Sequence, residues 1–277
     1  MSPLQVFVQG LGVLGPGMPD WAAAQAALAS PPSWGPQPVA LPPPARLPAA
    51  ERRRSGAIIK LSLAVAEQAV AMAGVDPADL ATVFSSSSGD GANCDALCQV
   101  LAGAERAVSP TRFTNSVHNA PAGYWHIACA SRAPSTSLCA FDASFGAGLL
   151  EAAAQCVAWQ RPVLLVSVDL PYPEPLHGTR PVADTFGVAL LLAPQAGAQG
   201  RALAWATAPG EAAAATPCSD DRLEALRLGI PAARSLPLLA ALAGAEGADV
   251  TLGMAGGLGL RVGVAPAAAP VVPAAGA

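Results

Sequence analysis

The chain has 277 residues, of which 52% are hydrophobic and 12% charged, and its formal net charge is −4. Because the charged share is about half of the roughly 25% that is usual, we expect part of the surface to be covered by a protein partner, unless loops rich in Ala, Gly and Pro take the place of charges. The one basic cluster, Arg52 to Arg54, is too narrow for a nucleic-acid interface, and the lack of a signal peptide and of an apolar run of roughly 20 residues predicts a cytoplasmic protein without a membrane span.

The first third of the chain is predicted to alternate strands with helices. A dense set of prolines excludes regular structure over Ser30 to Pro48. Further along, apolar residues recur at helical spacing from Ile58 to Ala69. In chain order we predict a strand at Gln5 to Leu14, a helix at Trp21 to Leu28 with Asp20 as its N-cap, the irregular proline-rich segment, a long helix at Glu51 to Gly74 and a strand at Ala81 to Ser85.

The middle of the chain continues this alternation, and the C-terminal third weakens it. From Asn93 to Thr207 we predict helices at Asn93 to Leu101 and Asn119 to Ala130, a loop at Thr111 to Val117, a strand at Ser135 to Ala140, a buried helix at Ala143 to Gln160, and strands at Pro162 to Val168, Phe186 to Leu192 and Arg201 to Thr207. Beyond Ala208 we expect short helices at Asp221 to Leu228 and Ser235 to Ala243, and a Gly-rich strand pair at Thr251 to Val264.

Strands that alternate with helices, and that are apolar without interruption, are typical of a layered α/β fold. We therefore predict a mixed, mostly parallel sheet between layers of helices. The change of pattern divides the chain into a main domain at residues 1–207, a poorly defined extension at residues 208–264 that packs on it, and a disordered Ala/Pro-rich tail at residues 265–277.

One unit of strand, sharp turn and buried helix, from Ser135 to Gln160, could carry chemistry. Such a turn presents a side chain at the N-terminus of a helix, where free amides and the helix dipole favour negative charge. A cysteine placed there becomes a thiolate nucleophile. Here the position holds Asp142, which is accommodated as an anion and as an N-cap but is a poor acyl acceptor, because a mixed anhydride hydrolyses readily.

The tract from Ser135 to Ala153 resembles the active-site segment of the β-ketoacyl-acyl-carrier-protein synthases, which have the thiolase fold. The resemblance puts Asp142 at the position of the family's nucleophilic cysteine. Three further tracts resemble the family's Asn-x-x-Ala-Gly helix, its next strand with an acidic turn, and its return strand: Asn115 to Ala128, Val163 to Pro175 and Asp184 to Leu190.

The tract Asn-Ser-Val-His-Asn-Ala-Pro-Ala-Gly-Tyr-Trp, from Asn115 to Trp125, is similar to one that recurs in the short chain length factors of bacterial aryl polyene clusters. The resemblance covers Gln5 to Pro194 and implies the N-terminal, thiolase-like half of a ketosynthase over residues 1–207. Active condensing enzymes use two histidines from a second half, whereas the histidines here, His118, His126 and His177, all lie in the first. The resemblance therefore implies no catalytic residue and no cofactor, and a heterodimer with a full-length ketosynthase that works on an acyl carrier protein. The spacing of the cysteines, without a CxxC pair or a nearby pair of histidines, predicts no metal site.

The resemblance also suggests residues for the partner interface or the acyl tunnel: Asn115, His118, Asn119, Tyr124, Trp125, Phe141 and Phe145. Each has a plainer interpretation. The two phenylalanines could be ordinary core residues, His118 and His126 could be structural, and Asp142 could be an N-cap and nothing more. Cys139 is either a displaced nucleophile or, as we expect for scattered cysteines, a buried inert residue.

Three functions remain open at this point. The first is a non-catalytic chain length factor that pairs with an active ketosynthase and shapes the tunnel for a growing polyene. The second is a weak acyltransferase or decarboxylase that acts on malonyl or acyl carrier protein through Asp142 or Cys139. The third is a binding or scaffold module that has no role in an acyl tunnel.

Overall fold

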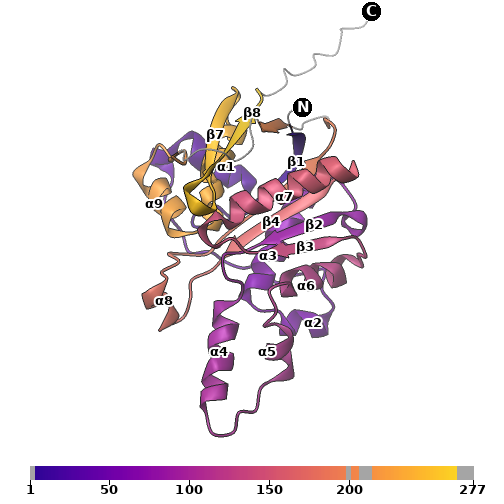
Figure 1. Cartoon of the computed structure of the whole chain (residues 1–277), viewed down its shortest axis with the longest axis vertical. Coiled ribbons are helices and arrows are strands. Elements are labelled where there is room, and N and C mark those ends of the chain that lie inside the picture. The colour runs from indigo at the N-terminus through magenta and orange to yellow at the C-terminus, as the bar shows by residue number, and fades with distance from the viewer. Residues whose placement is uncertain (1–3, 198–200, 206–213, 267–277) are drawn as a thin grey trace, which may run out of the picture.

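A mixed sheet of eight strands runs through the computed structural model, which describes residues 4–197, 201–205 and 214–266 (Figure 1). The strand order is β3-β2-β4-β5-β1-β6-β8-β7. The strands are β1 (Leu4–Leu14), β2 (Ala81–Ser85), β3 (Ser135–Leu138), β4 (Val163–Asp169), β5 (Phe186–Ala193), β6 (Arg201–Trp205), β7 (Ala248–Gly253) and β8 (Gly259–Val264). The predicted 265–277 tail lies outside the described residues except for Ala265 and Pro266.

Helices flank the sheet on both faces. The α-helices are α1 (Trp21–Ala29), α2 (Ala49–Arg54), α3 (Ala57–Ala73), α4 (Gly91–Ala102), α5 (Pro110–Thr114), α6 (Ala120–Cys129), α7 (Ser144–Trp159), α8 (Leu176–Thr179), α9 (Asp221–Gly229) and α10 (Leu236–Ala243). Short 3-10 turns are η1 (Pro31–Ser33), η2 (Pro77–Asp79), η3 (Phe141–Ala143), η4 (Ala232–Ser235) and η5 (Ala255–Gly257). The layered α/β fold with a mixed sheet is therefore confirmed.

The expectation that the sheet is mostly parallel is wrong. Among the described strands, β2 pairs in parallel with β3 and β4, and the other five pairs are antiparallel. Uninterrupted apolar strands indicate burial on both faces, which is usual in parallel sheets. An antiparallel strand held between two layers of helices has the same sequence pattern, and β5 is such a strand, with every residue buried.

The two faces of the sheet form two separate hydrophobic cores. Along β4, Leu164 and Val166 pack with α3 and α6, whereas Val163 and Leu165 pack with α7 and the C-terminal helices. The first core needs a close approach of α3 to β1. At Gly10 a Cβ atom would lie 2.1 Å from the Ala69 carbonyl oxygen, so glycine is what allows this contact.

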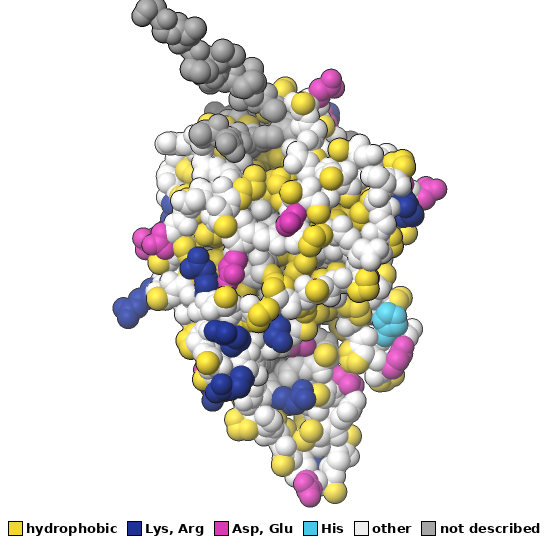
Figure 2. All heavy atoms as spheres, turned by 180° about the vertical axis from the view of Figure 1, so that it is seen from behind, with side chains coloured by type: hydrophobic (Ala, Val, Ile, Leu, Met, Phe, Trp, Pro, Cys, Tyr) yellow, Lys and Arg dark blue, Asp and Glu magenta, His cyan; other side chains and the backbone are white. Residues whose placement is uncertain are grey.

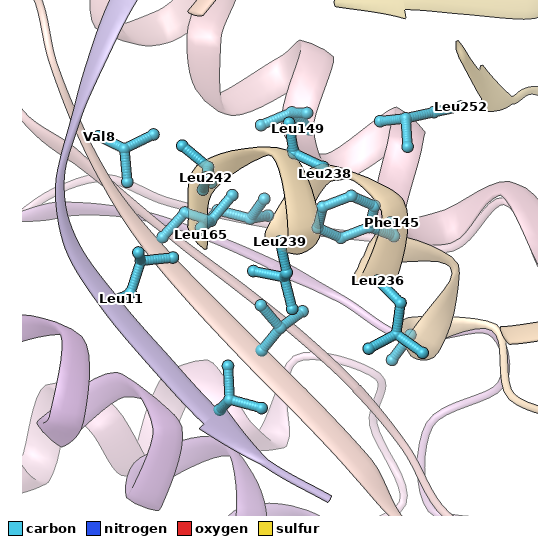
Figure 3. Packing of buried hydrophobic residues seen from close by; sticks show 14 of the residues in the cluster. Val8, Leu11, Phe145, Leu149, Leu165, Leu236, Leu238, Leu239, Leu242 and Leu252 are labelled. Carbon is cyan, nitrogen blue, oxygen red and sulfur yellow. The ribbon is translucent and has the colours of Figure 1, made fainter. Parts of the chain in front are cut away.

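The second core is completed by the C-terminal part of the chain. Figure 3 shows Leu238, Leu239 and Leu242 of α10 packed among Leu149 of α7 and Leu165 of β4. The β7–β8 hairpin, predicted as a Gly-rich strand pair, extends the sheet through β8 and β6. The part of this face that α7 leaves uncovered is thus closed by this chain's own C-terminal residues.

Two local predictions differ from the structure. The single helix expected at Glu51 to Gly74 is two helices, because Ser55 takes an extended conformation (ψ 123°) and its hydroxyl donates to the Arg52 carbonyl. Ser and Gly both favour helix ends over helix interiors. The loop expected at Thr111 to Val117 begins inside α5, which Pro110 starts at its first position.

Candidate functional site

The turn between β3 and α7 has the sharp geometry that the sequence predicts. Phe141 takes a positive φ of 53°, a region that bulky residues rarely adopt. Ser144 stabilises the turn, since its hydroxyl accepts from the Ala140 amide at 3.0 Å and donates to the Phe141 carbonyl at 2.6 Å. The side chain at the strained position, Phe141, is 59% exposed.

Asp142 is not the N-cap of the following helix, so that interpretation is wrong. The N-cap of α7 is Ala143, and no side chain caps this helix. The Asp142 carboxylate instead accepts from Arg180 Nη2 at 3.0 Å through Oδ1 and from Arg234 Nη2 at 2.9 Å through Oδ2. Hydrogen bonds between a guanidinium group and a carboxylate are charge-assisted and strong, so the two arginines take up both oxygens of this side chain.

Arg180 also lies against the ring of Phe141, with its guanidinium carbon 3.4 Å from the ring centre. Phe141, Asp142, Arg180 and Arg234 therefore form one group, which we call the Asp142 cluster. Its members come from η3, from the residue that follows α8, and from η4. The two arginines were missed at the sequence level, because each stands alone in a stretch without a recognisable motif.

Cys139 lies just before the turn and is exposed, which contradicts the expected burial. Its thiol donates to the Ser87 carbonyl with a distance of 2.9 Å. The exposure arises because β3 is an edge strand that pairs only with β2 among the described strands. Cys94 and Cys98 on α4 are exposed too, whereas burial raises the pKa of Cys129 and Cys156 to about 11.

A buried carboxyl, Asp169, ends strand β4 behind the turn. The amide of Ser87 donates to it at 2.8 Å and the hydroxyl of Ser86 at 3.3 Å. Burial raises the pKa of Asp169 to about 6, and these hydrogen bonds lower it in part. The Ser85 to Gly89 tract therefore contains a tight loop whose Ser86 and Ser87 donors point at Asp169.

The seven residues predicted for the partner interface or the acyl tunnel fall into a buried group and an exposed group. Trp125, Phe145 and Tyr124 are 0%, 1% and 6% exposed and pack inside this chain's own cores. Asn115 is buried as well, and it links two segments by donating to the Arg54 carbonyl and accepting from the Tyr124 hydroxyl. His118, Asn119 and Phe141 are exposed. Of the seven candidates, only these three can meet a partner without a rearrangement.

A projection formed by α4 and α5 extends from the body of the molecule (Figure 1). Asn93 is the only buried residue of these two helices. Large apolar side chains on the projection and on the neighbouring segments are about half exposed or more: Leu101, Phe113, Val117 and Ile127. Exposed apolar side chains of this size are available for a protein contact.

A basic groove of about 610 Å³ lies at the base of this projection, lined by Arg53, Arg54, Arg112 and Asp90 among other residues. Figure 2 shows Lys and Arg side chains gathered on this part of the surface. Three arginines against one aspartate give the groove a net positive charge. No helix in the described part of the chain is both long and apolar enough to cross a membrane, and no three His, Cys, Asp or Glu side chains there group as metal ligands would.

A family model described as the N-terminal domain of β-ketoacyl synthases matches residues 21–240. No curated protein matches the chain. Among solved structures, the ketosynthase (ApeO) in complex with its chain length factor (ApeC) from Xenorhabdus doucetiae gives a TM-score of 0.67 at 22% identity, over 94% of this chain and 99% of that one.

Two further structures give similar scores. The ishigamide ketosynthase/chain length factor has a TM-score of 0.68 at 17% identity, over 94% of this chain and 98% of that one. The AntDE:AntF structure, a type II polyketide acyl-carrier protein in complex with its ketosynthase, has a TM-score of 0.68 at 11% identity, over 96% and 100%. These likenesses show that the chain has the α/β fold of the matched chains, over nearly their whole length.

Proposed function

The chain belongs to the β-ketoacyl synthase family, as its sequence resemblance predicted, and we propose that it is a non-catalytic chain length factor. In this role it pairs with an active ketosynthase and shapes the tunnel in which a chain grows on an acyl carrier protein. The observation that carries the proposal is the Asp142 cluster. At the position that the resemblance assigns to the nucleophile, a carboxylate is held by two arginines.

Pairing with a ketosynthase is supported by the surface around β3. Its edge is unpaired within the described sheet, and all four of its residues are at least partly exposed. Free strand edges readily pair with a second chain. The exposed apolar residues of the α4–α5 projection supply the hydrophobic contact that a stable heterodimer needs.

The basic groove supports the proposal that this chain, with its ketosynthase, interacts with an acyl carrier protein. Its arginines suit an acidic partner or a phosphate group. The aryl polyene product is supported by the Asn115 to Trp125 tract alone.

Co-expression with a candidate ketosynthase, followed by size-exclusion chromatography, tests the pairing. We expect a heterodimer, and we expect Phe113→Asp to abolish it, because this side chain is 69% exposed on the projection and its replacement leaves the cores intact. Leu228→Asp is the matched control, with 59% exposure on α9. A stable monomer that never co-purifies with the ketosynthase would contradict the proposal.

A second candidate function, acyl transfer through Cys139, is favoured by the exposure of its thiol. Intact-mass measurement after incubation with an acyl thioester separates the two functions. An acyl adduct on the wild-type chain that is lost in Cys139→Ala would establish the transferase. If the mass of the wild-type chain is unchanged after incubation, acyl transfer through Cys139 is ruled out and the non-catalytic role is supported.

A further inference from the structure

The two arginines of the Asp142 cluster have far more hydrogen-bond donors than Asp142 uses. A guanidinium group carries five N–H donors. Arg180 and Arg234 each give one nitrogen, Nη2, to the shared carboxylate, and within the described residues neither side chain donates to any other acceptor. The Nε atoms of both arginines are buried without a partner in this part of the chain. Each guanidinium group could bind a carboxylate through two nitrogens, but each binds Asp142 through only one.

The charges of the cluster do not balance either. Two guanidinium groups face one carboxylate, which leaves one positive charge on side chains that are 22% and 28% exposed. Solvent screens such partly buried charges less than it screens fully exposed ones. The N-terminus of α7 lies beside the cluster without a side-chain cap and without an acidic residue in its first turn, so its dipole adds positive potential.

We propose that Arg180 and Arg234 form a binding site for a small carboxylate ligand, which enters beside Asp142 and accepts from the Nη donors that Asp142 leaves unused. The half-exposed ring of Phe141, adjacent to Arg180, offers an apolar surface for the carbon chain of that ligand. Asp142 acts as a built-in carboxylate: it holds both guanidinium groups in place and competes with the ligand for them.

Calorimetric titration of the purified full chain with malonate, at constant ionic strength, tests the site. We expect binding that Arg180→Gln and Arg234→Gln each weaken about tenfold or more, since each removes a charge-assisted hydrogen bond. We expect Asp142→Asn to bind malonate more tightly, because it removes the competing charge and keeps the shape of the side chain. Arg261→Gln is the control, since Arg261 also pairs with an aspartate, Asp249 at 2.6 Å, but outside the cluster.

The melting temperature of each variant, measured without ligand, separates loss of binding from loss of folding. Equal malonate affinity in the wild type and both arginine variants would overturn the proposal, as would weaker binding by Asp142→Asn. A carboxylate supplied by a partner protein is distinguished by pull-down: if Arg234→Gln abolishes pairing with the ketosynthase and leaves malonate affinity unchanged, the small-ligand site is wrong. If malonate binds as expected and no ketosynthase pairs, the proposed function fails and this site remains.

Discussion

The carboxylate of Asp142 lies between two guanidinium groups that come from residues 38 and 92 positions further along the chain. It thereby ties the turn at η3 to the residue after α8 and to η4. Asp169, at the end of β4, is the opposite kind of carboxyl, since it is buried and its hydrogen bonds come from the neutral donors of Ser86 and Ser87. At the residue scale the two acids therefore respond differently to mutation and to pH.

Asp142→Ala is expected to lower the free energy of unfolding by about 1 kcal/mol. It breaks two ion pairs and leaves two guanidinium groups without their acceptor, but partial exposure limits the cost. Urea denaturation measures the change. Asp249→Ala, which breaks the exposed pair with Arg261, serves as the comparison, and a larger effect there than at Asp142 would contradict the anchoring role.

Asp169 is expected to make stability depend on pH. Its pKa is about 6 in the folded chain, against an ordinary value of 3.8. Between these values the folded state binds a proton that the unfolded state has lost, so the free energy of unfolding falls as pH rises from about 4 to about 6, by at most about 3 kcal/mol. In Asp169→Asn this contribution is absent. Urea titrations at pH 5 and pH 8 should therefore show a smaller loss for the variant, and equal losses would rule out this assignment.

At the scale of elements, the contact between β1 and α3 depends on glycine residues in the strand. The backbone oxygens of Val65 and Ala69 lie where Cβ atoms of Gly12 and Gly10 would be, at 2.0 and 2.1 Å. The helix can lie this close only because the strand presents no side chain there. The same approach brings Leu61 and Val65 onto β5 at Gly187.

Gly10→Ala is expected to destabilise the fold by about 2 kcal/mol or more, because the backbone of α3 must move away from β1. Gly123→Ala is the matched control: no atom lies within 4 Å of its Cβ position, and alanine favours a helix, so a gain of up to about 1 kcal/mol is expected on α6. Thermal unfolding of both variants measures the contrast. A melting temperature unchanged by Gly10→Ala would show that the helix can shift freely.

At the scale of the whole molecule, the C-terminal residues are part of the same core as the N-terminal strands. α10 and η4 pack on the face of the sheet that α7 shares with them, and the β7–β8 hairpin continues the sheet itself. This closure places Arg234 beside Asp142. One segment thus completes the core and supplies half of the proposed ligand site.

Leu239→Ala is expected to cost about 2 to 5 kcal/mol of unfolding free energy, as a fully buried leucine in this shared core. The variant should still unfold in a single cooperative transition, in which the N-terminal strands and the C-terminal helices unfold together. Leu228→Ala, at 59% exposure on the neighbouring helix, should cause little change. Two separate transitions in Leu239→Ala would mean that the C-terminal part unfolds by itself.

Local and periodic features were accessible from the sequence because neighbouring residues determine them. The strands, the buried helix α7, the Asp20 cap, the turn at Phe141 and the family all follow from short tracts of sequence. The mostly parallel sheet was a wrong prediction, since burial on both faces produces the same apolar strands in either direction. The N-cap at Asp142 was wrong for another reason: its partners lie far away in the chain.

What only the tertiary structure decided is which distant residues meet. An ion pair between residues 92 positions apart leaves no periodic trace in the sequence, so neither Arg180 nor Arg234 could be assigned in advance. Burial of Trp125 and Phe145, and exposure of Cys139, likewise depend on which elements pack together. The sequence by itself determined the family and the turn, and it predicted that Asp142 stands at the position of the family's cysteine, whereas the fold determined what holds Asp142 in that place.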